Sequence, residues 1–180
     1  MNWLGKLVQK EISKKDTVLD LGCGIMACTL DTCPTYPKTR LKCRHITGMD
    51  VHSNYLHLLK ERPYITVVKG LLPDGLSVFV DSSFDVVLLL DIIEHLEYEK
   101  SMLLISEAER IARRKVIIYT PAYFYDNQHG KKEHFPYTGM GDNSLFEHKI
   151  FIEPEILVDM GYNISFPKPD ENTYGVKEIG

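Results

Sequence analysis

The sequence has 180 residues, of which 44% are hydrophobic, and its 21 basic and 25 acidic side chains give a formal net charge of -4. This length suits one domain better than two, and the negative charge excludes the basic surface that follows a phosphate backbone, so we expect no nucleic-acid partner. No stretch approaches the roughly 20 apolar residues of a membrane span, and lysines interrupt the first sixteen residues, where a signal peptide needs an apolar run. We expect a cytoplasmic protein with no membrane partner.

The first two thirds of the chain alternate between helical and extended patterns. Apolar residues from Trp3 to Ile12 have helical spacing and predict a helix within residues 1–15. Another apolar face predicts a helix over 104–112, with the cations Arg110, Arg113, Arg114 and Lys115 complementing the dipole of its last turn. Short runs rich in Val, Ile and Leu predict strands buried on both faces, at 17–21, 45–50, 65–70, 84–91 and 115–120.

The last third is less regular. Residues 121–152 are rich in aromatic, glycine and polar residues without periodicity, which is typical of a lid or binding loop. A short helix (154–161) and a strand (162–166) are predicted next, and the polar tail from Pro167 is predicted to be frayed. We therefore expect a single domain, with a helix (1–15), a core (16–120), a substrate-side loop (121–152) and a C-terminal helix, strand and tail (153–180).

Two glycines follow the first predicted strand, in the stretch VLDLGCGIMACTL that begins at Val18. A parallel sheet binds ligands beyond the carboxyl ends of its strands, and glycines there let a ligand approach bare backbone. Gly22, Gly24 and Ala27 fit the G-x-G-x-x-A pattern of dinucleotide sites, so a nicotinamide-dependent oxidoreductase is one alternative. Asp20, just ahead of the turn, suits a cationic ligand better than a pyrophosphate, and S-adenosylmethionine carries both an ammonium and a sulfonium.

Three segments together carry a family resemblance. VLDLGCG, the acid that closes TGMD, and FDVVLLLDIIEHL resemble class I S-adenosylmethionine-dependent methyltransferases over about residues 16–120. The resemblance implies a Rossmann-like three-layer α/β sandwich, with a mostly parallel sheet, helices on both faces and an antiparallel strand near the C-terminus. The later segments TPAYFYDNQ and DNSLFEHKIFIEPEILVDMGY are similar, more loosely, to the substrate side of small-molecule members.

The resemblance also implies a cofactor site across the first, second and fourth strand ends. Asp20, Gly22 and Gly24 match the motif that holds the methionine moiety, and Asp50 matches the acid that binds the ribose. A carboxylate at a strand end is also, by its own chemistry, a good acceptor for a vicinal diol. The implied cofactor-binding residues are Asp20, Gly22, Cys23, Gly24, Asp50, Val51, Gly70, Leu71, Asp91 and Ile92.

The sequence departs from the family pattern at three places. Met26 replaces a third glycine of the first motif, and Leu71 stands where members place an acid for the adenine, with Asp74 as a candidate substitute. Asp50 follows Gly22 by 28 positions, more than the roughly 20 expected, and prolines in the interval predict an insertion or a shortened first helix. These departures motivate a second alternative, a methyltransferase-like binding protein with impaired turnover.

Methyl transfer from a sulfonium is an in-line displacement, which needs a base only where the nucleophile arrives protonated. His95 and His148 are the candidate catalytic residues, although His95 could instead pack or cap a helix and His148 could be solvent-exposed. We therefore predict S-adenosylmethionine-dependent methyl transfer to a small-molecule acceptor, with S-adenosylhomocysteine as product and with no prediction of oligomeric state.

No metal site is predicted. The four cysteines, Cys23, Cys28, Cys33 and Cys43, lack the C-x2-C pairs of zinc sites and are expected to be reduced thiols. The segment HGKKEH, with His129, Glu133 and His134, is one residue off the H-x-x-E-H spacing of a zinc protease helix.

Overall fold

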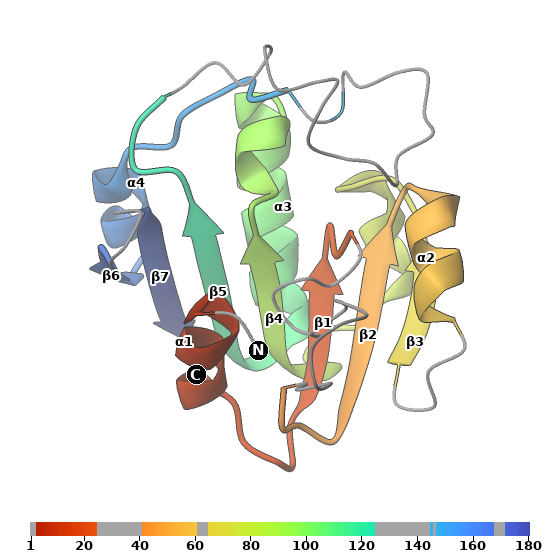
Figure 1. Ribbon diagram of the computed structural model, residues 1–180. Coiled ribbons are helices and arrows are strands. Elements are labelled where there is room, and N and C mark those ends of the chain that lie inside the picture. Colours follow the sequence, from red (N-terminus) through yellow and green to blue (C-terminus); the bar gives the residue numbers. More distant parts are fainter. Residues whose placement is uncertain (1–2, 25–40, 61–64, 125–144, 146, 168–171) are drawn as a thin grey trace.

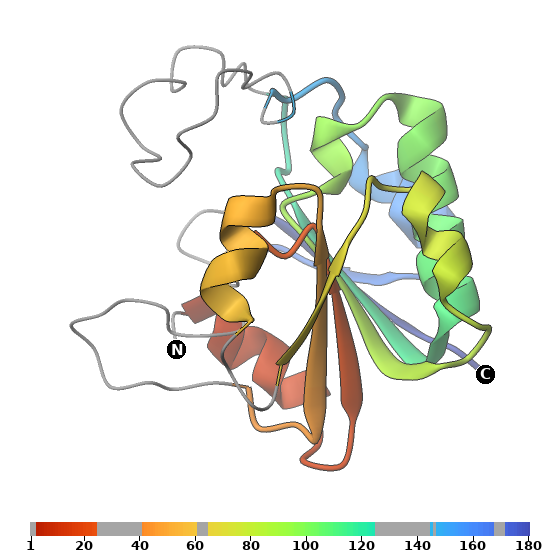
Figure 2. The ribbon, with the colours of Figure 1, turned by 90° about the vertical axis from the view of Figure 1, so that its right-hand side faces the viewer.

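The computed structural model describes residues 3–24, 41–60, 65–124, 145, 147–167 and 172–180. Met26, Pro34, Pro37, Cys28, Cys33 and most of the predicted loop at 121–152 lie outside them. In the described residues a seven-stranded sheet has helices on both faces, as Figure 1 and Figure 2 show. The strands are β1 (Thr17–Leu21), β2 (His45–Asp50), β3 (Ile65–Lys69), β4 (Phe84–Leu90), β5 (Ala112–Thr120), β6 (Asn163–Ser165) and β7 (Thr173–Glu178). The helices are α1 (Trp3–Glu11), α2 (Ser53–Leu59), α3 (Tyr98–Ile111) and α4 (Pro154–Asp159), with short 3-10 helices η1 (Asp74–Val78) and η2 (Ile93–His95).

The strand order is β3-β2-β1-β4-β5-β7-β6. The first five strands are parallel, and β7 is antiparallel to both of its neighbours, β5 and β6. The parallel strands all end at the top edge of the sheet in Figure 1. The order reverses between β1 and β4, which is the point where open α/β sheets form a ligand crevice. The predicted mostly parallel, Rossmann-like fold is confirmed, and β7 is its antiparallel strand.

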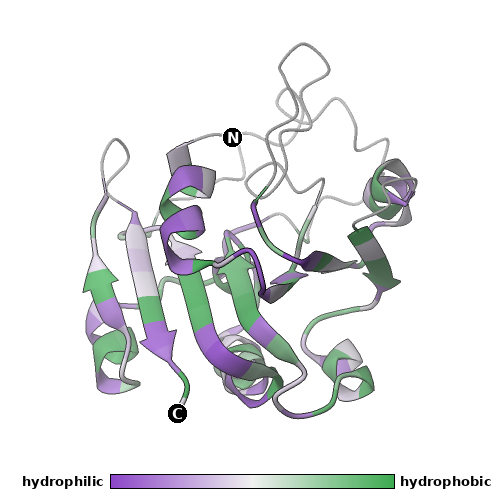
Figure 3. Cartoon of the chain, turned by 90° about the horizontal axis from the view of Figure 1, so that it is seen from below, coloured by the Kyte–Doolittle hydropathy of each residue, from purple (hydrophilic) through white to green (hydrophobic). Residues whose placement is uncertain are grey.

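Two hydrophobic cores lie on the two faces of the sheet. On one face, Val18 of β1 packs in a cluster with Leu4 and Val8 of α1 and with residues of α2. On the other, Leu19 packs in a cluster with residues of α3 and α4, including Leu104. Because successive side chains of a strand point to opposite faces, the mostly apolar central strands, largely hydrophobic in Figure 3, supply both cores.

The prediction of a frayed tail is wrong for residues 173–178. They form β7, whose Thr173 pairs with Thr120 and whose Glu178 pairs with Lys115 at the other end. Tyr174 and Gly175 are buried, because this strand covers the edge of β5 that a frayed tail would leave open. A polar composition alone did not reveal this pairing.

The assignment of four cations to the end of one helix is also wrong. Helix α3 ends at Ile111, and β5 begins at the next residue. Only Arg110 lies in the last turn, where it binds Glu107. The other three lie in β5 and form ion pairs with carboxylates of other elements, namely Arg113 with Asp85, Arg114 with Asp16, and Lys115 with Glu11.

No helix in the described ranges combines the length and the apolar character that a membrane crossing requires.

Candidate functional site

The glycine turn after β1 is tied to the end of β2. The backbone N–H groups of Gly22 and Cys23 both donate to the Met49 carbonyl, at 2.9 and 3.1 Å. Gly22 has a φ of +68°, and a Cβ there would lie 2.5 Å from the Ile92 side chain. Gly24 also has a positive φ, +50°, but no atom of the described residues lies within 4 Å of the position that its Cβ would take. Glycine is therefore required at Gly22 by both conformation and contact.

Asp50, the last residue of β2, holds this turn from the other side. Its Oδ2 accepts a hydrogen bond from the Gly24 N–H at 2.8 Å, and its Oδ1 accepts one from the His52 N–H at 2.8 Å. An ionised carboxylate has about four lone-pair sites. Two acceptor sites therefore remain for hydroxyl groups, even though Asp50 is only 7% exposed.

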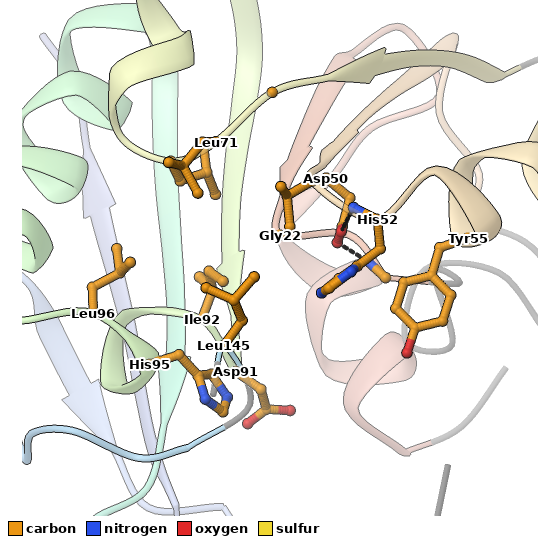
Figure 4. A pocket seen from close by; sticks show the side chains of 14 residues that line it. Gly22, Asp50, His52, Tyr55, Leu71, Asp91, Ile92, His95, Leu96 and Leu145 are labelled. Atoms are coloured by element: carbon orange, nitrogen blue, oxygen red, sulfur yellow. Dashed lines mark hydrogen bonds between the residues drawn. The ribbon is translucent and has the colours of Figure 1, made fainter. Parts of the chain in front are cut away.

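A pocket opens between these elements at the carboxyl edge of the sheet. It holds about 650 Å³ of empty space, part of which is open solvent. In Figure 4, Asp50 and His52 lie on one side of it and Asp91, Ile92 and His95 on the other. The residues predicted for the cofactor that line it are Gly22, Gly24, Asp50, Val51, Gly70, Leu71, Asp91 and Ile92.

Asp20 and Cys23 are not among the residues that line this pocket. Asp20 is 4% exposed within β1, one residue ahead of the end of the strand. Cys23 is buried in the turn, and burial, with the negative charges of Asp20 and Asp50, raises the pKa of its thiol. This side chain is consequently a neutral thiol at neutral pH. Among the described residues, neither Cys23 nor Cys43 forms a disulfide.

The corner after β4 forms the opposite wall. Asp91 has a φ of +53°, an uncommon conformation for a residue with a side chain. Its N–H donates to the Tyr119 carbonyl at 2.8 Å, which fixes the turn that brings Ile92 against Gly22. Strained backbone of this kind concentrates at binding and catalytic sites.

The end of β3 forms a third, apolar wall. Gly70 leaves room for Met49, whose terminal methyl would lie 2.1 Å from a Cβ at that position. Leu71 is 45% exposed and lines the pocket. Asp74 is exposed on η1 and is not among the lining residues, so an apolar side chain occupies the place where the family pattern has an acid.

The histidines predicted to be catalytic lie together. His95 lines the pocket, and its Nδ1 lies 3.2 Å from the Glu147 carbonyl oxygen. A carbonyl oxygen only accepts, so Nδ1 is the donor. The rings of His95 and His148 meet edge to face, with centroids 4.9 Å apart. The structure thus joins two histidines that are far apart in the sequence.

Sequence reasoning missed the buried acid beside them. Glu94 is 2% exposed, and its Oε2 accepts a hydrogen bond from the Thr120 hydroxyl at 3.2 Å. Burial, reinforced by the negative charge of Asp91, raises the pKa of the Glu94 carboxyl to about 8. The available signal was that Glu94 follows the two apolar residues Ile92 and Ile93 in the run LLLDIIEHL, because a charged residue in a buried segment requires a reason.

Five other pocket residues were also missed. These are His52, Tyr55, Leu72, Leu96 and Leu145. No motif marks them, because they come from the start of α2, from the residues before η1 and after η2, and from the segment before α4. Only folding brings these segments to one edge of the sheet.

The sequence matches a family model described as a methyltransferase domain over residues 19–120. A search of curated proteins found no match. Among solved structures, the fold is similar to that of a SAM-dependent methyltransferase from Archaeoglobus fulgidus, with a TM-score of 0.63 and 17% identity over 97% of this chain and 94% of that chain. It is also similar to the DhpI–SAH complex structure, with a TM-score of 0.63 and 12% identity over 96% of this chain and 81% of that chain. A third structure, that of the YcgJ protein from Bacillus subtilis, gives a TM-score of 0.49 and 19% identity. The match covers 66% of this chain and 50% of that chain, so this chain spans about half the length of that protein.

The region matched by the family model makes up more than half of the 180 residues. It contains the glycine turn, Asp50 and the Asp91–Ile92 corner, which are the features that form the pocket. The resemblance found in the sequence is thereby confirmed, and the chain belongs to the methyltransferase-domain family of the class I S-adenosylmethionine-dependent superfamily.

Proposed function

We propose that this protein transfers the methyl group of S-adenosylmethionine to a small-molecule acceptor. The observation that carries the proposal is the pocket bounded by the glycine turn, Asp50 and the Asp91–Ile92 corner. It lies at the strand-order reversal where a nucleotide-like ligand is expected. The similarity to a structure described as a SAH complex supports the same ligand class.

In this proposal Asp50 accepts hydrogen bonds from the ribose hydroxyls through its remaining lone pairs. The methionine part lies beside Gly22 and Gly24, where the backbone carries no side chain of its own. The negative charge of Asp91, exposed at the rim, attracts the positively charged amino and sulfonium groups. Leu71 packs against the adenine in place of the acid that many members use.

The acceptor enters from the side of His95 and His148. Leu96 and Leu145 add apolar surface there, which excludes water from the reacting atoms. An in-line displacement needs the acceptor atom, the methyl carbon and the sulfur aligned, and this alignment is the main contribution of such a pocket. A proton is removed only where the acceptor arrives protonated.

The test is calorimetric binding of S-adenosylmethionine, S-adenosylhomocysteine and NAD. We expect saturable binding of the first two and weaker binding of NAD. Asp50→Ala should weaken the S-adenosylmethionine affinity at least several-fold, because it removes the ribose acceptor and the support of the glycine turn. Asp159→Ala, an exposed acid on α4, is the matched control and should bind as the parent does.

Unchanged affinity in Asp50→Ala would remove the ribose assignment. Binding of NAD more tightly than S-adenosylhomocysteine would replace the proposal with the oxidoreductase alternative. Cofactor binding without transfer to any acceptor would favour the binding protein with impaired turnover.

A further inference from the structure

Three side chains with metal-binding atoms lie together, and one of them, His95, lines the pocket. A carboxylate oxygen of Glu94 and ring nitrogens of His95 and His148 all lie within 4.8 Å of one another. Glu94 and His95 come from η2, whereas His148 comes from the segment that precedes α4. From this cluster we propose that Glu94, His95 and His148 bind a divalent transition-metal ion.

Each of the three ligands is held in place by a neighbouring group. Thr120, the last residue of β5, donates its hydroxyl to Glu94. The Glu147 carbonyl accepts from Nδ1 of His95, and the neutral tautomer that makes this bond carries its lone pair on Nε2. Metal-binding histidines characteristically donate their other ring N–H to a carbonyl or carboxylate in this way.

The backbone fixes the third ligand. The N–H groups of Lys149 and Ile150 donate to the Glu94 carbonyl, at 2.9 and 3.4 Å. These bonds hold the segment that carries His148 against η2. On the other side, the buried hydroxyl of Ser101 donates to the Ile93 carbonyl at 2.6 Å, which ties η2 to α3.

The charge of this cluster calls for a cation. Glu94 is buried and lies in the field of the Asp91 carboxylate. Within the part of the chain that the structure describes, no basic side chain forms an ion pair with Glu94. A buried carboxyl group loses its charge unless it is paired with a cation or coordinates a metal. A divalent ion that replaces its proton would therefore supply the cationic partner that Glu94 lacks among the described side chains.

The donor set indicates the class of ion. Imidazole nitrogens favour zinc, cobalt, iron or nickel over magnesium or calcium, and one carboxylate with two histidines is a set found in catalytic metal sites. Ligand atoms on one such ion lie roughly 3 to 3.5 Å apart, given bonds of about 2.0–2.2 Å, so binding draws the three side chains closer together. Three protein ligands leave coordination positions open, and since His95 lines the pocket, an open position can face it.

One consequence follows for the acceptor, and it rests on the proposed function. A divalent ion lowers the pKa of a hydroxyl group bound to it. An ion at this site would therefore favour acceptors that offer an oxygen nucleophile. Ion binding itself does not depend on the proposed function.

In the experiment the protein is first stripped of metal with EDTA. It is then titrated with Co²⁺, and binding is followed by visible absorption. No cofactor is present, so failure of this test and failure of the proposed function are distinguishable. We expect one equivalent to bind with micromolar or tighter affinity and with a spectrum free of thiolate charge-transfer bands, since the cysteines are not ligands. The affinity should fall by about tenfold or more in His148→Ala and in Glu94→Gln.

His45→Ala is the matched control, because His45 lies at the opposite, amino end of β2 and should leave the affinity unchanged. Circular dichroism verifies that each variant folds. If Glu94→Gln does not fold, His148→Ala decides the result, because His148 lies in a half-buried segment. No uptake at millimolar Co²⁺, a thiolate spectrum, or an unchanged affinity in His148→Ala would each overturn the proposal.

Discussion

At the scale of single residues, the two glycines of the turn serve different purposes. Both have positive φ angles, yet among the described residues only Gly22 has a neighbour that an added side chain would strike. The clearance at Gly22 is what allows Ile92 to close the wall of the pocket, whereas Gly24 provides an N–H for Asp50. The two positions therefore form a natural matched pair.

We expect Gly24→Ala to lower the free energy of unfolding by about 1–2 kcal/mol, because a residue with a side chain is strained in the left-handed conformation. Gly22→Ala should cost at least about 1 kcal/mol more, because its methyl group would lie 2.5 Å from Ile92. Urea unfolding of both variants measures the difference. Equal losses would show that the contact with Ile92 relaxes at no cost.

Asp85 shows how a single acid joins three strands. It directly precedes the buried part of β4. Asp85 accepts hydrogen bonds from the Thr17 N–H at 2.8 Å and the Thr17 hydroxyl at 2.9 Å, and it pairs with Arg113 of β5. Its partial burial opposes ionisation, but these hydrogen bonds and the Arg113 charge outweigh burial and hold the pKa of the Asp85 carboxyl below 3.8.

A lowered pKa means that the folded state binds this proton less readily than the unfolded state does. The stabilisation is therefore complete above about pH 4 and is lost as the pH falls below that value. We expect Asp85→Asn to lose about 1–2 kcal/mol at pH 7 and to show a shallower fall in stability below pH 4. The control is Asp81→Asn, whose exposed pair with Arg110 should contribute little. If the stability of Asp85→Asn and of the parent fell equally steeply below pH 4, this role of Asp85 would be contradicted.

At the scale of elements, β7 determines how the sheet is completed. It pairs with β5 over six residues and places Tyr174, 4% exposed, in the core beneath α1. A strand contributed by the chain terminus thus covers an edge of the parallel sheet.

Tyr174→Ala should therefore lower the free energy of unfolding by about 3 kcal/mol or more, as expected for an aromatic residue removed from a core. Tyr98→Ala is the control, because that ring is 44% exposed at the start of α3. Chemical denaturation of the two variants is the measurement. Equal stability of both would mean that the tail does not contribute to the core.

At the scale of the whole molecule, the pocket joins β1, β2, β3, β4 and the segment before α4. A ligand that bridges them should stabilise the entire fold. At a S-adenosylmethionine concentration of about one hundred times its dissociation constant, the gain is about 2.7 kcal/mol. This corresponds to a rise in Tm of roughly 5–10 °C for a domain of this size.

Differential scanning calorimetry measures this rise. NAD at the same concentration is the control ligand and should leave Tm nearly unchanged, and Asp50→Ala should show a smaller rise with S-adenosylmethionine than the parent. A larger rise with NAD would contradict the proposed cofactor.

Much of the fold could be predicted from local sequence. The five parallel strands appear as runs of Val, Ile and Leu because both faces of the sheet are covered. The positions of Gly22, Gly24 and Asp50 could be predicted, because each lies at the end of a parallel strand. Such ends meet at the carboxyl edge of the sheet, whatever the rest of the chain does. Two predictions failed where a partner was distant. Residues 173–178 form a strand only because β5 presents an open edge to them, and the cations of β5 find their carboxylates on other elements.

The sequence by itself therefore determined the parallel sheet, the glycine turn and the acid that closes β2, because each follows from the period and composition of neighbouring residues. Only the tertiary structure decided that Glu94 is buried, that His148 lies against His95, and that β7 completes the sheet. These features depend on contacts between residues far apart in the chain. Such contacts form when the burial they provide exceeds the entropy lost in closing the intervening loops, and no local pattern records that balance.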